Sequence, residues 1–390
     1  MSTSTRSRAI DAVLADAVAS GAVPNVVAVA ADRDGVIYEG AAGPRAPGQD
    51  RTVDVDTPLR IMSMTKPVVT VTALRLAEQR KLDIEAPVEE YCPEFAAIGL
   101  LERIDDGRPV LRTPSRKATV TQLMTHTAGL GYWFWNADVL AWQQAVGAPK
   151  AMSGRRAVLD VPLVAEPGSV FEYSNATDWL GLVVEAVCGR SLDEAVTAIV
   201  TEPLGMTRTG FALNERARAE LVPVHLRGPG GGWAATEVDL PSQPEYVSGS
   251  RGLYSTARDY LTFQRMLLAG GTAPDGTTLL APATVQAMFA NQIGPLDFPA
   301  EIRTVDPQSA FGLALGPGYK WGHGLLLNTS DQPGRRRAGS GAWMGLFNTF
   351  FWIDPAAGVT GAIYTQVLPF LVPEAVRLSQ DFETALYASL

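Results

Sequence analysis

The stretch Ser63-Met64-Thr65-Lys66 stands where a predicted N-terminal β-hairpin gives way to an apolar helix over residues 67–79. A serine at the start of a helix lies near unpaired backbone N–H groups and the positive end of the helix dipole. A lysine three residues later lies on the same face, so its amine comes within reach of the serine hydroxyl. A neutral lysine can take the serine proton and create a nucleophile without a histidine. The structural alternative is a helix-capping serine beside a solvated lysine.

The composition is that of a globular protein. The chain has 390 residues, of which 46% are hydrophobic and 19% charged, enough for one large two-lobed domain or two domains. The net charge of −9 gives no reason to expect a nucleic-acid partner. Cys92 and Cys188 lie in apolar segments without metal-ligand spacing, so we expect free thiols. The polar residues 1–8 lack the apolar core of a signal peptide, and no 18-residue apolar span occurs; we therefore expect a cytoplasmic protein without a membrane partner.

Both ends of the chain carry strand patterns next to a helix pattern. Apolar residues at helical spacing between Ile10 and Val18 predict a first helix, and a last helix is expected over residues 373–389. Strands are predicted at residues 26–31 and 36–39, around Asp34-Gly35, and at residues 347–353 and 359–367. These patterns predict an antiparallel sheet built from both chain ends and flanked by the terminal helices.

The middle of the chain is predicted to be mainly helical. The helical segments are residues 68–79, 121–125, 176–188 and 192–201. Residues 212–250 and 290–340 are rich in Gly and Pro, and we expect long surface loops there that rim a cleft. The predicted fold class is therefore α+β with an inserted helical lobe. Residues 1–66 and 251–390 would form the sheet lobe and residues 67–250 the helical lobe, with the active site in the cleft between them.

A second polar group follows in Tyr173-Ser174-Asn175, just before the helix predicted from Ala176. Tyr173 can act as general base or proton relay if a cation lowers its pKa, and Lys66 is the obvious cation. Asn175 can donate its amide to a substrate carbonyl or hold Lys66. The structural alternative is a surface tyrosine with Asn175 as a helix cap.

Two apolar stretches are candidates for the wall of a cleft. Trp343-Met344-Gly345 is predicted to begin a strand, where Gly345 allows a ligand or another backbone to approach and the strand edge can offer N–H groups. The alternative is an ordinary core strand with a bulge. Tyr132, Trp133 and Trp135 belong to a run of four aromatics that cannot all face one core from a regular element. We favour a hydrophobic wall of the substrate cleft over a core role for them.

Together these stretches resemble the serine β-lactamase and penicillin-binding-protein superfamily. More narrowly, the chain resembles the family VIII carboxylesterases, which share the class C β-lactamase fold. The resemblance covers nearly the whole chain in order, and its supporting stretches are Ser63-Met64-Thr65-Lys66, Leu123 to Leu130, Pro167-Gly168, Tyr173-Ser174-Asn175, Glu202 to Met206, Gly252 to Thr256, Trp343-Met344-Gly345 and Phe351 to Pro355.

The resemblance implies a role for each motif. Ser63 would be the acylated nucleophile, and Lys66 and Tyr173 would activate it and pass a proton to the leaving group. The backbone N–H groups of Ser63 and Leu346 would form the oxyanion hole. Asn175 would orient Lys66 or the substrate, and water would hydrolyse the acyl-enzyme. Neither a metal nor an organic cofactor is implied.

The third motif departs from the β-lactamase pattern. β-Lactamases of this superfamily usually carry Lys or His where this chain has Trp343. A tryptophan cannot supply a charge to a substrate carboxylate, but it can pack against an apolar acyl or alcohol group. Trp343, Met344 and Gly345 are thus expected to bind a neutral ester, although Met344 stands where a small residue is usual.

The function expected from the sequence is a carboxylesterase acting on small esters with short acyl chains or aryl groups, with weak side activity on β-lactams. The same fold leaves open a β-lactamase or amide hydrolase, an acyltransferase, and a relative that only binds ligand. A Ser-His-Asp hydrolase would need a Gly-x-Ser-x-Gly elbow, which the sequence lacks. Of its three histidines, His126 lies in a loop typical of the family and is expected to be structural, and His225 and His323 lie in loops with no obvious Asp partner. The oligomeric state stays open.

Overall fold

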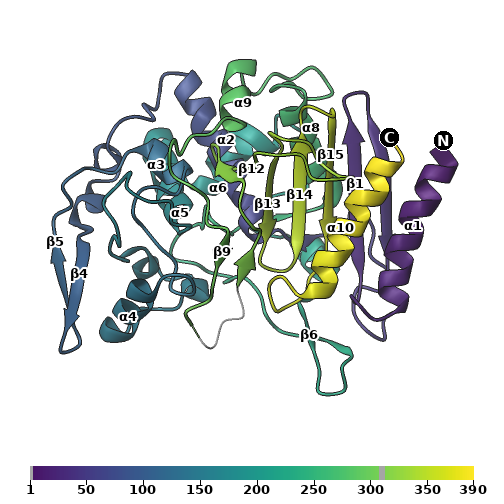
Figure 1. The fold of residues 1–390 in the computed structure, drawn as a ribbon, viewed down its shortest axis with the longest axis horizontal. Coiled ribbons are helices and arrows are strands. Elements are labelled where there is room, and N and C mark those ends of the chain that lie inside the picture. The colour runs from purple at the N-terminus through teal and green to yellow at the C-terminus, as the bar shows by residue number, and fades with distance from the viewer. Residues whose placement is uncertain (1–2, 307–311) are drawn as a thin grey trace.

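Strands from the two ends of the chain pair with each other, as the sequence predicts. The computed structural model describes residues 3–306 and 312–390, and its main sheet has the strand order β11-β12-β13-β14-β15-β1-β2 with antiparallel neighbours throughout (Figure 1). These strands are β1 Val26–Asp32, β2 Val36–Ala42, β11 Tyr319–Trp321, β12 Leu326–Asn328, β13 Gly341–Gly345, β14 Thr349–Asp354 and β15 Val359–Tyr364.

The first hairpin follows directly from its sequence. β1 is a continuous apolar run, and its first six residues are buried, as expected for a strand that is covered on both faces. Asp32 Oδ1 accepts hydrogen bonds from the backbone N–H groups of Asp34 and Gly35, both at 2.9 Å, and so closes the turn to β2. β1 then pairs with β15 from Val27–Tyr364 to Asp32–Val359, which joins the chain ends.

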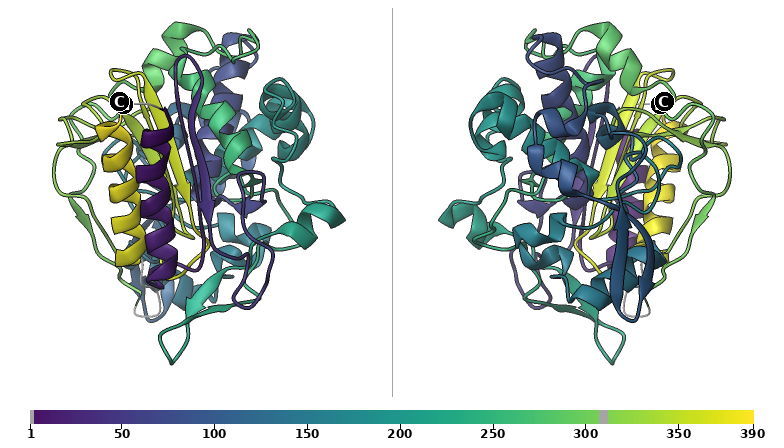
Figure 2. Two further views of the ribbon diagram at one scale, coloured as in Figure 1. Left: turned by 90° about the vertical axis from the view of Figure 1, so that its right-hand side faces the viewer. Right: turned by 90° about the vertical axis from the view of Figure 1, so that its left-hand side faces the viewer.

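Helices cover both faces of the sheet. The terminal helices α1 and α10 lie side by side on one face, where Ile10, Leu14 and Phe382 pack against Trp352 and Ile363 of the sheet (Figure 2). α8 packs on the other face against β1 and β15. The helices are α1 Thr3–Ala19, α2 Thr65–Glu78, α3 Val120–Met124, α4 Ala137–Val146, α5 Ala176–Cys188, α6 Leu192–Val196, α7 Glu215–Glu220, α8 Ala257–Leu268, α9 Pro282–Met288 and α10 Pro373–Ala388.

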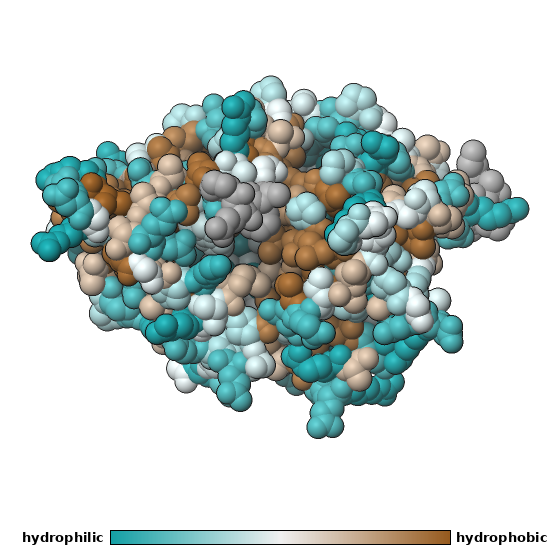
Figure 3. Space-filling view, turned by 90° about the horizontal axis from the view of Figure 1, so that it is seen from below, coloured by the Kyte–Doolittle hydropathy of each residue, from teal (hydrophilic) through white to brown (hydrophobic). Residues whose placement is uncertain are grey.

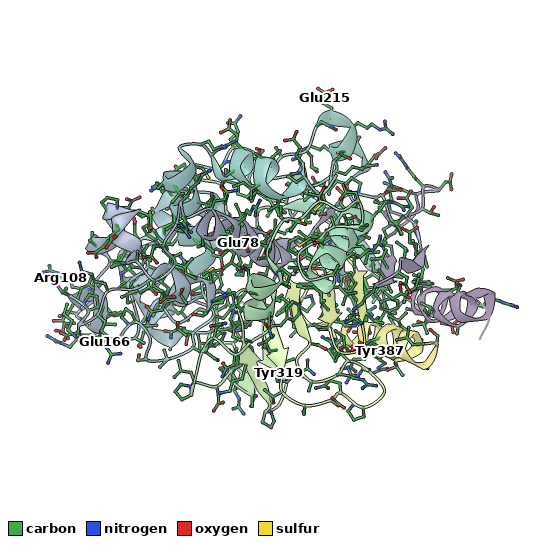
Figure 4. The ribbon with its side chains drawn as sticks, turned by 90° about the horizontal axis from the view of Figure 1, so that it is seen from above. Glu78, Arg108, Glu166, Glu215, Tyr319 and Tyr387 are labelled. Atoms are coloured by element: carbon green, nitrogen blue, oxygen red, sulfur yellow. The ribbon has the colours of Figure 1, made fainter. Side chains whose placement is uncertain are left out.

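Helix α2 is the central element of the helical part. Its residues from Thr65 to Leu74 are all buried, because the helix is largely apolar around its circumference and packs against α5 and α6. Glu78 at its end accepts hydrogen bonds from Ala281 N at 2.7 Å and Thr284 Oγ1 at 2.5 Å, which ties α2 to α9. Seen from above, Glu78 lies well inside the outline of the molecule, whereas Arg108 and Glu166 lie at its left edge (Figure 4).

Two expectations about the later chain need correction. Trp343-Met344-Gly345 ends strand β13 instead of beginning a strand, because the chain turns at Leu346–Asn348 before β14 starts. The segment 290–340 is not only loop: β11 and β12 within it extend the main sheet. Strands of three residues are too short to show an alternating pattern in the sequence.

Short paired strands complete the structure. They are β3 Leu59–Arg60, β4 Leu100–Asp105, β5 Arg108–Arg112, β6 His225–Arg227, β7 Trp233–Ala235, β8 Tyr254–Ser255, β9 Glu301–Ile302 and β10 Leu313–Ala314. Cys92 and Cys188 are both free thiols. Within residues 3–306 and 312–390, no helix combines the length and apolar character that crossing a bilayer requires.

Candidate active site

Ser63 lies in a short 3₁₀ turn, Met62–Met64, that runs directly into α2. Met62 has φ 48°, in the left-handed region that residues other than glycine rarely adopt. Such strained positions cluster at functional sites, where surrounding packing holds them in place. Ser63 itself is only partly buried, so its hydroxyl is presented to the cavity described below.

Lys66 lies one turn into α2, and its amine reaches the serine. Its Nζ donates hydrogen bonds to Ser63 Oγ at 3.1 Å and to the Ser250 carbonyl at 2.9 Å. The lysine is only 1% exposed, and this burial lowers its pKa well below the usual value. A neutral amine in contact with a hydroxyl is the arrangement that a general base requires. The solvated lysine of the structural alternative is therefore not what the structure shows.

Tyr173 completes the polar centre, but the structure changes the chemistry expected of it. Burial raises the pKa of its phenol well above the usual value, and this outweighs the opposing effect of its hydrogen bonds with Ser63 and Trp343. Lys66 Nζ lies 4.7 Å from the centre of the Tyr173 ring, over its face. The expectation that Lys66 lowers the pKa of Tyr173 is thus wrong. Tyr173 is held as a neutral phenol that can donate a proton.

Trp343 supports Tyr173 and does not form the wall of the cavity beside Ser63. Its indole Nε1–H donates a hydrogen bond of 2.9 Å to the phenol oxygen of Tyr173. The Trp343 ring is buried and packs edge-on against Trp321 at 4.7 Å between ring centres. The tryptophan in the middle of β13 therefore contacts the candidate catalytic group and is covered by other rings, outside the lining of the cavity at Ser63.

Gly345 brings strand β13 close to the segment that leads into Ser63. A Cβ atom at Gly345 would lie within 2.4 Å of the Ile61 carbonyl oxygen and of Thr349 Oγ1. The predicted close approach is therefore that of another backbone. Leu346, the next residue, lines the same cavity as Ser63. Met344 does not line it and instead lines a separate cavity with Ala342 and Phe350.

The cavity at Ser63 has a volume of about 470 Å³, within the range of small-molecule sites. Most of its lining is apolar or aromatic. The lining residues are Met62, Ser63, Tyr132, Trp133, Phe134, Leu140, Gln143, Gln144, Ala148, Lys150, Met152, Tyr173, Arg251, Asp306 and Leu346. The lower face of the molecule likewise has apolar surface in its middle, bordered by hydrophilic margins (Figure 3).

The aromatic run contributes to this cavity, but Phe134 lines it in place of Trp135. Tyr132 and Trp133 line it as predicted, and so does Phe134. Trp135 instead lines a separate hollow of about 200 Å³ with Glu172, so its placement in the substrate cavity was wrong. Consecutive residues in an irregular segment point in different directions, and the sequence does not show which one turns away.

Asn175 lies deeper than expected. Its Nδ2 lies 3.4 Å from the Val158 carbonyl, and its Oδ1 is buried without a hydrogen-bond partner among the described residues. With Tyr132 and Arg251 it lines a hollow of about 20 Å³ outside the main cavity. The amine of Lys66 is held by the Ser250 carbonyl, the position that we had expected Asn175 to occupy.

Three residues at this centre escaped the sequence analysis: Asp178, Ser250 and Arg251. Asp178 is fully buried in the first turn of α5, with its Oδ2 3.6 Å from Arg251 Nη1. A charged residue within the apolar run of α5 was the available signal, because buried carboxylates are rare unless they are paired. Ser250 acts through its backbone carbonyl, which no side-chain motif can reveal.

His126 has a structural position. Burial lowers the pKa of His126 well below the usual value, and its Nδ1 accepts a hydrogen bond from Ser174 N at 3.3 Å. Its ring lies against Tyr173 at 4.6 Å between ring centres. Ser63 has Lys66, not an imidazole, as its nitrogen partner. Over the described parts of the chain, no three His, Cys, Asp or Glu side chains gather closely enough to hold a metal ion.

Comparison with known proteins supports this picture. A family model described as Beta-lactamase matches residues 10–386. Esterase EstB of Burkholderia gladioli is 31% identical, over 91% of this chain and 89% of its own. Monacolin J acid methylbutanoyltransferase of Aspergillus terreus is 30% identical, over 95% of this chain and 93% of its own. The structure of simvastatin synthase (LovD) from the same fungus superposes with a TM-score of 0.85 at 27% identity, covering 97% of both chains. The predicted fold is therefore confirmed.

Proposed function

This chain belongs to the beta-lactamase family, and we propose that it hydrolyses small carboxylic esters through an acyl-enzyme on Ser63. Within that family, the match to an esterase over most of both chains supports the predicted carboxylesterase class. One observation supports the assignment of Ser63 above all others. The buried amine of Lys66 lies 3.1 Å from its hydroxyl, so a base and a nucleophile are already in contact.

Acylation begins with a proton transfer from Ser63 to Lys66. Burial lowers the pKa of Lys66 and so favours its neutral amine, which accepts the Ser63 proton as the oxygen attacks the ester carbonyl. The Ser250 carbonyl accepts a hydrogen bond from the same amine and fixes its direction. The ammonium that forms gains from this acceptor and from the Tyr173 ring face beneath it.

The negative charge of the tetrahedral intermediate needs donors close to Ser63. We assign this role to the backbone N–H groups of Ser63 and Leu346. Both residues line one cavity, and the contact of Gly345 with Ile61 brings their two segments together. Such donors typically stabilise the transition state by about 3 kcal/mol each.

The leaving alcohol needs a proton, and Tyr173 is placed to give it. Its phenol stays protonated because burial raises its pKa, and it is hydrogen-bonded to Ser63. As the carbon–oxygen bond breaks, the phenol protonates the leaving oxygen and recovers a proton from the Lys66 ammonium. Water then attacks the acyl-enzyme by the reverse sequence, which releases the acid and free Ser63.

The lining of the cavity favours neutral esters with short acyl or aryl groups. Tyr132, Trp133 and Phe134 offer apolar ring surface. Two cations line the cavity: Arg251, whose charge is offset by the buried Asp178 at 3.6 Å, and Lys150. With Trp343 covered by other rings, the third motif supplies no charge next to Ser63. We therefore expect only weak turnover of anionic β-lactams.

Acyl transfer to an alcohol is the second candidate function. A relative at 30% identity is named a methylbutanoyltransferase, and the same acyl-enzyme serves either water or an alcohol. Adding a neutral alcohol to an ester assay distinguishes the two functions: a transferase forms a new ester in place of the free acid.

Other features of the proposal rest on the sequence. The division into a sheet lobe of residues 1–66 and 251–390 and a helical lobe of residues 67–250 is a working hypothesis, with Ser63 close to one boundary. The cytoplasmic location and the absence of nucleic-acid and membrane partners stay predictions. The acidic net charge supports the statement on nucleic acid.

The decisive experiment compares wild type with Ser63→Ala on p-nitrophenyl butyrate and on a chromogenic cephalosporin. Intact mass is recorded after brief incubation. We expect fast ester turnover, slow cephalosporin turnover and an acyl adduct in the wild type only, with both proteins equally folded. Fast cephalosporin turnover with little ester cleavage would identify a β-lactamase. Undiminished ester cleavage by Ser63→Ala would overturn the proposal.

The two partners of Ser63 are tested in the same assay. Lys66→Ala and Tyr173→Phe should each lower kcat by several orders of magnitude, because each removes a group that moves a proton. The effects of residues that act as one unit are not additive, so the double variant should be little slower than either single variant. Nearly unchanged turnover in Tyr173→Phe would exclude the role given to the phenol.

A further inference from the structure

Helix α5 carries a carboxylate in its first turn that is completely buried. Asp178 has 0% exposed surface in a largely apolar helix, and a buried charge is costly unless it is paired and hydrogen-bonded. Its Oδ1 accepts hydrogen bonds from Ser248 Oγ at 2.6 Å and from Ser250 N at 2.9 Å. Hydrogen bonds to a charged acceptor are stronger than those between neutral groups, so Asp178 holds the segment of Ser248 and Ser250 firmly against α5.

The segment that Asp178 holds also holds the candidate base. The carbonyl of Ser250 accepts the 2.9 Å hydrogen bond from Lys66 Nζ, while the N–H of Ser250 is bound to Asp178. Gly249 lets this segment lie directly on α5, since a Cβ there would come within 2.4 Å of the Thr177 carbonyl oxygen. Asp178 is therefore connected to Lys66 through one peptide unit.

Arg251 supplies the opposite charge at the other end of the same segment. Its Nη1 lies 3.6 Å from Asp178 Oδ2, and its Nη2 donates a 3.0 Å hydrogen bond to the phenol of Tyr246. Both charges act on Lys66. Burial is the main cause of its low pKa, while Asp178 raises that pKa and Arg251 lowers it.

We propose that Asp178 and Arg251 are a pair of positioning residues that fix where the Lys66 amine lies and how readily it accepts a proton. The inference rests on the proposed function, because it concerns the base of that reaction. The pair is buried with the base, so its two charges act through little screening. The polar or titratable groups that face or act on Lys66 are Ser63, Tyr132, Tyr173, His126, Asp178, the Ser250 carbonyl and Arg251.

Removing the charge of Asp178 and removing that of Arg251 should shift the titration of Lys66 in opposite directions. Asp178→Asn keeps an acceptor for Ser248 and Ser250 but removes the negative charge, so Lys66 should lose its proton at lower pH. Arg251→Gln removes the positive charge, so Lys66 should lose its proton at higher pH. Each midpoint should move by about one pH unit or more, the size typical of a close charge.

The titration of Lys66 can be observed directly, without reference to turnover. The chain has five lysines, so protein labelled with [ε-¹³C]lysine gives few NMR signals, and the Lys66 signal is the one missing in Lys66→Ala. The acid limb of kcat/KM for p-nitrophenyl butyrate should move in parallel with the NMR midpoint. A parallel shift separates a role in proton affinity from a general loss of structure.

Controls make the result decisive. Asp138→Asn removes an exposed carboxylate from the first turn of α4 and should leave the Lys66 midpoint unchanged. Arg251→Lys keeps the charge and should restore a midpoint near that of wild type. If Asp178→Asn does not fold, the Lys66 midpoint in Arg251→Gln tests the inference by itself. Unchanged midpoints, or shifts in the same direction, would overturn the inference. An active Ser63→Ala variant would instead overturn the proposed function.

Discussion

Trp343 combines two contacts through one side chain. Its indole N–H donates to the phenol oxygen of Tyr173, so the proton of that phenol must point elsewhere, and Ser63 is its other partner. The ring also closes the aromatic cluster around Tyr173 by packing on Trp321. An ammonium at this position could not take that place among packed rings without a large desolvation cost. The residue that suggested an ester substrate therefore acts through Tyr173.

Removing the indole donor tests this role. Trp343→Phe should lower kcat about tenfold, because one hydrogen bond that orients Tyr173 is lost, while KM stays close to the wild-type value. Initial rates on p-nitrophenyl butyrate measure both constants.

Trp321→Phe is the matched control. The indole of Trp321 belongs to the same cluster, but it donates to the Met124 carbonyl at 3.2 Å instead of to Tyr173. Its kcat should stay within about twofold of wild type if hydrogen bonding to Tyr173 is what matters. Equal losses in the two variants would assign the effect to packing.

At the scale of elements, the site depends on how strand β13 meets the start of α2. The strand ends at Gly345, where the missing Cβ allows contact with Ile61, two residues before Ser63. The Tyr260 hydroxyl of α8 fixes the same turn from the other side by donating to the Met64 carbonyl at 2.9 Å. Ser63 is therefore placed by packing between elements as well as by its own helix.

A side chain at the end of β13 should disturb this arrangement. Gly345→Ala places a methyl group against backbone that cannot move freely, so we expect a loss of roughly 1–3 kcal/mol in the free energy of unfolding. We also expect a fall in kcat of at least about tenfold, because Leu346 and Ser63 move apart.

Urea unfolding and ester kinetics measure these effects. Gly35→Ala serves as the control, since a Cβ at Gly35 meets no atom within 4 Å and its φ is not in the left-handed region. That variant should match wild type in both measurements. A Gly345→Ala enzyme with wild-type kcat would show that the strand end does not position the site.

At the scale of the whole molecule, an ion pair attaches the C-terminal helix α10 to the rest of the chain. Glu383 of α10 is bound by Arg336 in a bidentate pair at 2.8 and 2.7 Å, and the N–H of Arg336 donates to it at 3.0 Å. This pair ties the helix that covers the sheet to the segment between β12 and β13. In the same region, the Tyr387 hydroxyl donates to Asp354 Oδ2 at 2.8 Å.

Breaking the buried pair should cost more than breaking an exposed pair on the same helix. Glu383→Gln leaves Arg336 without its charged partner, so we expect the free energy of unfolding to fall by about 3 kcal/mol. Glu374→Gln, which breaks a half-exposed pair with Arg227, should cost less than about 1 kcal/mol. Urea unfolding followed by circular dichroism measures both. Similar small losses of unfolding free energy in the two variants would contradict the view that Glu383 attaches α10 to the segment between β12 and β13.

The sequence by itself determined the sheet formed from both chain ends, the longest helices, and Ser63, Lys66 and Tyr173 of the centre. Periodicity located α2, α5 and α10 to within a few residues, because the apolar face of a helix repeats over many positions. It missed the start of α1, which begins at Thr3, seven residues before the predicted segment. Ser63 and Lys66 are three positions apart on one helical turn, so their contact is local and follows from the sequence.

The tertiary structure alone decided how these groups work. The hydrogen bond between Trp343 and Tyr173 spans 170 positions of the chain, and that between Lys66 and Ser250 spans 184. No local pattern encodes such pairs, because they arise from the packing of separate segments. Burial likewise set the protonation of Lys66 and Tyr173, since desolvation depends on everything that surrounds a group and not on its neighbours in sequence.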